Sequence, residues 1–218
     1  MLLKKINSPE DIKFLNFDPL MQLCKELRKD IINVTSKNGG HLGSSLNTVE
    51  LTVALHYVFD APKDKIVWDI GHQAYFHKTL TGRNDKFATL RKEKGISAST
   101  KRGKSYYDAF SAAHTSTPIP AVLEMKVAKN SQNQTPKVVS IIEDGVLNSA
   151  MAYEALSNTG YLKNNFIVIL NNNEMSISPY SILEIIKQIL NFSNLTSSNA
   201  HTASQEYEQN FNADVAQG

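Results

Sequence analysis

The order of apolar and polar positions along the chain predicts an alternation of helices and short buried strands. Apolar runs rich in Val and Ile occupy 137–142 and 166–170, and such runs are typical of strands buried in a parallel sheet. The segment 147–162 between them is long enough for a crossover helix. A third run at 66–70 predicts another strand, which ends at a Gly-His turn. The pattern therefore indicates a strand–helix–strand unit within an α/β domain.

Apolar residues three and four positions apart predict amphipathic helices in the first half of the chain. Asp18 and Pro19 suit the N-cap and first position of one helix, which Gly39 would end. The apolar stripe of this helix is Leu20, Cys24, Leu27, Ile31 and Val34. Asn47 to Glu50 is typical of a capping box. The buried face of the helix that follows should be Leu51, Ala54, Leu55 and Val58.

The remaining pattern completes a single domain. We expect a short helix over 75–81, loop with helical pieces over 84–107, a helix beginning at Pro118 or Pro120, and a last amphipathic helix over 179–191. Residues 1–192 should then form one α/β domain with a mostly parallel sheet and helices on both faces. Ligands bind such sheets at the carboxyl ends of the strands. Residues 193–218 are polar and should form a flexible tail.

Composition narrows the possible functions. The chain has 218 residues, of which 41% are hydrophobic and 20% charged, which suits a globular domain with a full core. Its net charge of +2 comes without a basic block, so nucleic acid is not an expected partner. The chain has no run of about 18 apolar residues, so we expect no membrane span. The single cysteine, Cys24, predicts a core side chain in a reducing compartment, and we expect the cytoplasm.

Oxygen-bearing side chains follow two of the predicted strands. Asp144-Gly145 comes just after the first, and Asn173 comes 29 positions later, after the second. Carboxylate and amide oxygens are hard ligands that suit Mg²⁺, and a glycine lets a phosphate approach the backbone. All three residue types are also common in turns, so the spacing alone leaves both interpretations open.

Longer motifs carry a specific resemblance. Four of these motifs follow one another along the chain in the order that the family has. They are Gly-Gly-His-Leu-Gly-Ser-Ser-Leu at 39–46, Trp-Asp-Ile-Gly-His-Gln-Ala-Tyr at 68–75, His-Thr-Ser-Thr at 114–117 and Asn-Asn-Asn-Glu-Met-Ser-Ile at 171–177. The chain from about position 3 to about position 189 thereby resembles the amino-terminal domain of 1-deoxy-D-xylulose-5-phosphate synthase, a transketolase-like thiamine-diphosphate enzyme. Enzymes of that family are roughly three times as long, and they carry the glutamate that activates the cofactor on a separate pyrimidine-binding domain.

The resemblance implies thiamine diphosphate and Mg²⁺ as cofactors. It places the metal on Asp144, Asn173 and the backbone carbonyl of Met175. It implies catalytic roles for His41, His72 and His114. The implied cofactor-binding residues are His72, Ala113, His114, Thr115, Gly145, Val146 and Asn173. The implied reaction is the condensation of pyruvate with glyceraldehyde 3-phosphate to 1-deoxy-D-xylulose 5-phosphate and CO₂, which feeds isoprenoid, thiamine and pyridoxal synthesis. A homodimer, or a partner chain with the pyrimidine-binding domain, is implied as well.

Other polar residues allow two interpretations each. His56, inside a predicted helix, should be structural. His77 is as suited to a phosphate or carboxyl contact as to a structural position. Lys78 and Arg83 could contact an anion or remain solvated on the surface.

Departures from the family pattern gather near the predicted site. Glu143 stands where the family has the first glycine of Gly-Asp-Gly, and a carboxylate there would repel a diphosphate and fill space. Ala113 replaces a glycine, and Asn172 replaces an aspartate. The chain is therefore predicted to be an amino-terminal domain that is inactive alone. The alternatives are a non-catalytic binding or scaffold module with this fold, or one subunit of a split transketolase.

Overall fold

The computed structural model describes residues 1–112, 114–146 and 149–171 of the chain. These residues all belong to one compact unit, Met1–Met175. The helix predicted over 179–191 and the tail predicted over 193–218 lie outside the described residues, so both stay predictions. No helix in the described part of the chain is both long and apolar enough to cross a membrane.

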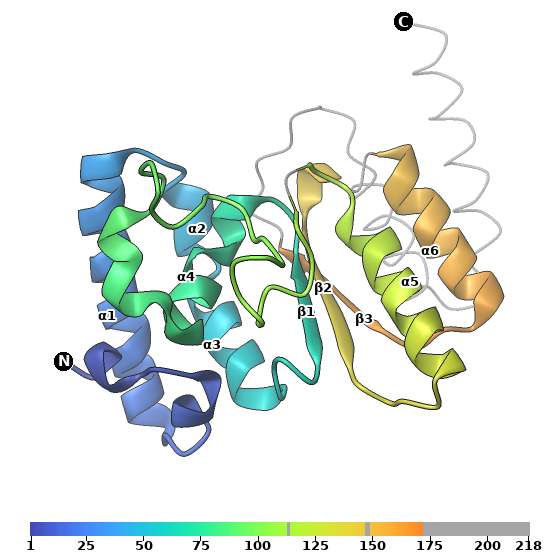
Figure 1. Ribbon diagram of the computed structural model, residues 1–218, viewed down its shortest axis with the longest axis horizontal. Helices are drawn as coiled ribbons and strands as arrows, with labels where there is room; N and C mark the ends of the chain where they lie inside the picture. Colours follow the sequence, from blue (N-terminus) through green and yellow to red (C-terminus); the bar gives the residue numbers. More distant parts are fainter. Residues whose placement is uncertain (113, 147–148, 172–218) are drawn as a thin grey trace, which may run out of the picture. The chain divides into compact units, whose positions relative to one another are not determined.

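A parallel sheet forms the centre of the described unit (Figure 1). Its strands are β1 (Lys65–Trp68), β2 (Val138–Glu143) and β3 (Ile167–Asn171), in the order β1-β2-β3. The three strands predicted from apolar runs are thus confirmed. Trp68 pairs with Ile141, and Glu143 pairs with Asn171, so the carboxyl ends of all three strands lie along one edge.

Helices cover both faces of this sheet, as predicted. On one face, α5 (Pro118–Ser131) packs against the strands and also contacts α6 (Ala150–Leu162), the crossover helix between β2 and β3. Val67 and Val138 face α5 and pack against its Val122. On the other face, Ile66, Trp68, Val139 and Ile141 pack with Leu55 of α3 (Val49–Val58). Neighbouring strand positions point to opposite faces, which explains the continuous apolar runs.

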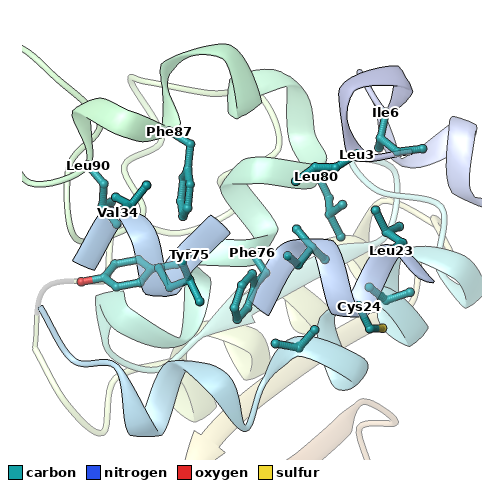
Figure 2. Close-up of a cluster of buried hydrophobic side chains, with 14 of the residues drawn as sticks. Leu3, Ile6, Leu23, Cys24, Val34, Tyr75, Phe76, Leu80, Phe87 and Leu90 are labelled. Atoms are coloured by element: carbon teal, nitrogen blue, oxygen red, sulfur yellow. The ribbon is translucent and has the colours of Figure 1, made fainter. Parts of the chain in front are cut away.

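A second apolar cluster holds the amino-terminal half together. It joins α1 (Phe17–Asn38) to α4 (Tyr75–Lys78) and to the short segments around them (Figure 2). Cys24 is buried in this cluster, as its place in the apolar stripe predicted. The remaining short elements are η1 (Leu3–Lys5), η2 (Pro9–Ile12), α2 (Gly43–Leu46), η3 (Gly71–Ala74), η4 (Thr79–Arg83), η5 (Asn84–Thr89) and η6 (Asp144–Val146).

The predicted start of α1 was wrong by two positions. The N-cap is Asn16, whose backbone is extended, and Asp18 lies inside the first helical turn. An acid in the first turn still interacts favourably with the amide dipoles of the helix, which explains why Asp18 gave a starting signal. Gly39 ends α1 as predicted, with a positive φ of 71°.

The capping box predicted for α3 was also wrong. Thr48 is the N-cap and makes no side-chain capping bond, while Glu50 pairs with Arg28 of α1. The buried face of α3 differs from the predicted apolar face, because it includes polar residues. Leu55 is buried as expected, but Ala54 and Val58 are exposed, and Val49, Thr52, Val53 and His56 are buried instead.

Candidate functional site

The candidate site lies at the carboxyl edge of the sheet. β1 leads into Asp69, Ile70 and then η3, while β2 ends at Glu143 and continues directly into η6. β3 ends at Asn171. Segments far apart in the sequence therefore meet at the edge where parallel sheets bind their ligands.

Two of the predicted histidines meet here. The rings of His41 and His72 lie 4.9 Å apart, centroid to centroid. Ser45, buried in α2, holds both residues by their backbones, because its hydroxyl lies 2.5 Å from the carbonyl oxygen of His41 and 3.1 Å from that of His72. The first half of the site is thus built by α2 and η3, and the catalytic roles of the two imidazoles stay predictions.

Glu143 contacts His72 directly. The Nε2 atom of His72 lies 2.8 Å from Oε1 of Glu143, and only 7% and 14% of the two side chains are exposed. The nitrogen donates and the carboxylate accepts, which makes a short, charge-assisted hydrogen bond. The Nδ1 atom of His72 is buried and has no partner among the described residues. His72 is predicted to bind the diphosphate, and one of its ring nitrogens is therefore already hydrogen-bonded to Glu143.

Asp69 is a second buried acid at this edge, which the sequence patterns did not single out. Both of its carboxylate oxygens face the backbone N–H of Ser116, at 3.2 and 3.3 Å. Burial, with a smaller contribution from the nearby carboxylate of Glu143, raises the pKa of Asp69 to about 7, although the hydrogen bond from the Ser116 amide acts to lower it. The signal that could have found it is an acid immediately after a buried strand.

The backbone on both sides of this contact is strained. Ile70 has a φ of 59° and Ser116 a φ of 71°. Positive φ is unfavourable for residues with a Cβ, most of all for a β-branched one such as Ile70. Each such residue costs about 1–3 kcal/mol and persists only where surrounding contacts hold it. Strain on either side of the Asp69 contact is typical of a functional loop.

A side-chain bridge connects β1 to β3. Gln73 is fully buried in η3, where its amide nitrogen donates to the carbonyl oxygen of Asp69 at 2.9 Å. Its amide oxygen accepts from Nδ2 of Asn171 at 3.1 Å. The bridge fixes the residue that opens the segment in which the metal ligand Asn173 was predicted.

The other predicted site residues have varied outcomes. His114 and Thr115 are exposed, and Nδ1 of His114 lies 3.4 Å from the Thr115 carbonyl oxygen. Asp144, Gly145 and Val146 form η6 at the end of β2. Ala113, Asn173 and Met175 lie outside the described residues. Within the part of the chain that the structure describes, no three or more His, Cys, Asp or Glu side chains gather to hold a metal ion.

The anion contacts suggested for Lys78 and Arg83 are corrected by the structure. Nζ of Lys78 is buried and donates to the carbonyl oxygens of Ser97 and Ala98, at 2.6 and 2.7 Å. Burial lowers the pKa of Lys78 to about 7. Arg83 pairs with the buried carboxylate of Asp108. Both cations are therefore internal, because the chain supplies its own acceptors for them.

His56 and His77 are structural in this fold. Nε2 of His56 lies 3.0 Å from Nδ1 of His77, and Nε2 of His77 lies 3.3 Å from Oδ1 of Asp108. Both imidazoles are fully buried, and burial lowers the pKa of each. The prediction for His56 is confirmed, and the carboxyl partner of His77 is a residue of this chain.

The buried acid at the candidate site predicts a measurable pH dependence. A group whose pKa is raised on folding stabilises the fold at low pH and loses that contribution as pH rises. Asp69→Asn should therefore gain stability relative to the parent between about pH 4 and about pH 7, by at most about 1.4 kcal/mol per pH unit. Denaturant unfolding of both proteins across this range measures the difference. A constant difference would show that Asp69 keeps an ordinary pKa.

Comparison with known proteins identifies relatives over nearly the whole chain. The family described as 1-deoxy-D-xylulose-5-phosphate synthase matches residues 3–217. The synthase of Desulfotalea psychrophila is 53% identical over 82% of this chain and 28% of its own length. Synthase 1 of Geobacter metallireducens is 49% identical over 95% of this chain and 33% of its own length. The chain thus spans about a third or less of these relatives. A transketolase structure from Campylobacter jejuni matches 72% of the chain with a TM-score of 0.62 at 21% identity, which shows the same fold.

Proposed function

Because the chain belongs to the 1-deoxy-D-xylulose-5-phosphate synthase family, we propose that it is the diphosphate-binding domain of a thiamine-diphosphate-dependent transferase. The observation that carries the proposal is the meeting of His41 and His72 beside the ends of β1 and β2. Paired imidazoles at this edge can hydrogen-bond phosphate oxygens and pass protons near neutral pH.

His72 lies where it could bind a diphosphate, but its contact with Glu143 is an obstacle. The buried Nδ1 atom of His72 lacks a partner within the described residues, and it would donate to a phosphate oxygen when the ring carries both protons. The Nε2 atom of the same ring is engaged by Glu143. A phosphate oxygen that bound through Nε2 would have to displace Glu143, and this competition should weaken the affinity.

A divalent metal completes the proposed site. Mg²⁺ would be held by Asp144, Asn173 and the carbonyl of Met175, as the family resemblance implies. Asp144 begins η6 directly after β2, at the same strand end as Glu143. A metal ion there would offset the negative charge that Glu143 adds, since carboxylate and phosphate oxygens are the ligands that Mg²⁺ prefers.

The proposed reaction joins pyruvate and glyceraldehyde 3-phosphate, with loss of CO₂, to give 1-deoxy-D-xylulose 5-phosphate. When bound, the cofactor supplies the carbanion chemistry. The chain's own residues would orient the cofactor. The imidazoles of His41 and His72 lie beside the strand ends, and the hydrogen bond between Gln73 and Asn171 fixes the carboxyl edge of the sheet. His114, which is exposed, would complete the set of proton-carrying groups. We place the reaction in the cytoplasm.

The complete enzyme would need a pyrimidine-binding domain, in a homodimer or on a partner chain such as the second subunit of a split transketolase. Large apolar side chains are available for such an assembly, since Phe14, Phe17 and Tyr161 are 89%, 74% and 86% exposed.

A non-catalytic binding module is the second candidate function. It is favoured by the Glu143–His72 hydrogen bond, because this pair lets the chain fill its own ligand position.

Residues 1–218 prepared alone should form no product from pyruvate and glyceraldehyde 3-phosphate with saturating thiamine diphosphate and Mg²⁺. The reason is that enzymes of the family activate the cofactor with a glutamate of the pyrimidine-binding domain. The assay would follow CO₂ release, with the full-length synthase of Desulfotalea psychrophila as a positive control. Product above the enzyme-free background would contradict the division of labour proposed here.

A further inference from the structure

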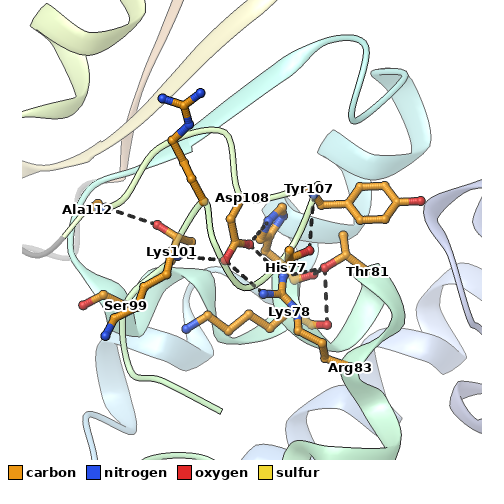
Figure 3. Close-up of polar contacts among 12 residues, drawn as sticks. His77, Lys78, Thr81, Arg83, Ser99, Lys101, Tyr107, Asp108 and Ala112 are labelled. Atoms are coloured by element: carbon orange, nitrogen blue, oxygen red, sulfur yellow. Dashed lines mark hydrogen bonds and ion pairs between the residues drawn. The ribbon is translucent and has the colours of Figure 1, made fainter.

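A strap formed by residues 97–112 packs beside the sheet and connects two parts of the candidate site. It begins next to η3, which carries His72, and it ends one residue before the segment of His114. It contains no helix or strand, so its path is fixed by its own turns and by contacts with the elements around it. Figure 3 shows the polar contacts that gather around it.

Asp108 is the buried centre of these contacts. Its Oδ1 atom accepts from NH2 of Arg83 at 2.8 Å and lies 3.3 Å from Nε2 of His77. Its Oδ2 atom accepts from NH1 of Arg83 at 3.0 Å and from the backbone N–H of Lys101 at 2.9 Å. One carboxylate therefore ties the strap to itself, to α4 and to the end of η4.

The charge of Asp108 is important to this arrangement. Burial alone would raise its pKa, but the hydrogen bonds from His77 and Arg83 hold the pKa well below its usual range. The two-pronged contact with Arg83 is the strong, directional form of such a pair. Only 1% of the Asp108 side chain is exposed, so removing its charge would leave the Arg83 guanidinium without a counterion.

The start of the strap touches the turn that carries His72. A Cβ atom on Gly71 would lie 2.6 Å from the carbonyl oxygen of Ala98 and 2.7 Å from Cα of Ser99, so the two backbones are in direct contact. Lys78 holds the same point through the carbonyl oxygens of Ser97 and Ala98. A shift of the strap here must move the turn beside it.

The end of the strap leads into the second site loop. The backbone N–H of Ala112 faces Oγ1 of Thr100 at 3.5 Å, and the backbone N–H of Arg102 donates to the hydroxyl of Ser111 at 3.0 Å. These bonds close the strap on itself just before His114. Four residues beyond Ala112, Ser116 meets the buried carboxylate of Asp69.

We propose that Asp108 is a positioning residue for the candidate site: through Arg83, His77 and the Lys101 amide it fixes the strap 97–112, and the strap fixes the loops of His72 and His114. The importance of those loops rests on the proposed function. The coupling itself is a property of the free chain, so it can be tested without cofactor.

The test is Asp108→Asn, observed by NMR of the chain with isotope-labelled histidine. Only six histidines are present, and single His→Gln variants assign their signals. We expect the His72 and His114 signals to shift together with those of His56 and His77. Trypsin cleavage after Lys101, Arg102 or Lys104, which are exposed on the strap, should become at least tenfold faster.

Glu50→Gln is the matched control, because it breaks the ion pair with Arg28 between α1 and α3, away from the strap. It should leave the His72 signal and the cleavage rate unchanged. Should Asp108→Asn fail to fold, Arg83→Lys keeps the Asp108 carboxylate and a cation but loses the two-pronged contact, and should give the same pattern more weakly.

Two results would overturn the proposal. Unchanged cleavage in a folded variant would mean that Asp108 does not hold the strap. Faster cleavage with unmoved His72 and His114 signals would mean that the strap does not position the site. Neither result depends on cofactor binding, so a chain that binds no thiamine diphosphate would still decide the question.

Discussion

Replacing Glu143 with glycine should tighten the binding of thiamine diphosphate with Mg²⁺ by about tenfold or more, which corresponds to about 1.4 kcal/mol. The Glu143 carboxylate holds Nε2 of His72 at 2.8 Å, and its side chain is mostly buried. Removing it frees the imidazole nitrogen for a phosphate oxygen and removes a like charge, whose repulsion at a few ångströms is worth on the order of 1–4 kcal/mol. Isothermal titration calorimetry of parent and variant measures the change.

Two further variants separate the causes. Glu143→Gln removes the charge but keeps most of the bulk, so its affinity should fall between those of parent and glycine variant. Glu154→Gln makes the same charge change at an exposed position of α6 and should leave the affinity unchanged. If Glu143→Gly binds no more tightly than the parent, then Glu143 does not compete with the cofactor.

Asp144→Ala introduced into the Glu143→Gly variant should reduce cofactor affinity by at least a hundredfold, about 2.7 kcal/mol, and should remove its dependence on Mg²⁺. The reason is that a metal held at the end of β2 would lose its carboxylate ligand, and the diphosphate charge would then be met by protein dipoles alone. Titrations with Mg²⁺ and with a chelator measure the effect.

The decisive comparison, made for each protein, is between its cofactor affinity with Mg²⁺ and its affinity with a chelator. With a chelator present, Glu143→Gly and the double variant should bind equally weakly. Mg²⁺-dependent binding that survives Asp144→Ala unchanged would refute the assignment of Asp144 as a metal ligand, while leaving the competition between Glu143 and the cofactor intact.

The sheet could be predicted because its strands are short, apolar on both faces and separated by a segment of helical length. Runs such as Val138 to Ile142, short and rich in β-branched residues, are typical of strands in a buried parallel sheet. Helix starts were less predictable, because each start offers more than one residue with capping chemistry. Asn16 and Asp18 compete at α1, and Asn47 and Thr48 compete at α3, and the local sequence does not decide between them. The buried face of α3 was missed because two polar residues on it are buried with their hydrogen bonds made inside the fold. Thr52 donates to the Thr48 carbonyl oxygen one helical turn back, and His56 contacts His77 of α4.

Sequence motifs drew attention to single residues of the candidate site but not to the contacts among them. His41 and His72 were found from motifs, and the structure places their rings together. The pairing of His72 with Glu143 joins residues 71 positions apart and left no local pattern. Lys78 was misjudged for a related reason, because its acceptors are backbone carbonyls 19 and 20 positions away, and backbone groups leave no trace in sequence.

The Asp69 contact and the Asp108 network share a further property. Each buried acid is held by groups that are distant in the sequence: the Ser116 amide for Asp69, and Arg83 and His77 for Asp108, which also accepts from the Lys101 amide of its own strap. Charged residues are rarely buried without such partners, so a prediction from sequence alone assigns them to the surface. For Asp108 only the folded arrangement identifies the carboxylate as internal, whereas the position of Asp69 directly after a buried strand was an available signal.

The central claim is that this chain is a diphosphate-binding domain, and calorimetric titration with thiamine diphosphate tests it most directly. The account predicts one-site binding to the parent and tighter binding to Glu143→Gly, lost for both with a chelator and lost when thiamine replaces its diphosphate. No heat of binding in either protein, or equal binding of thiamine without the diphosphate, would contradict it.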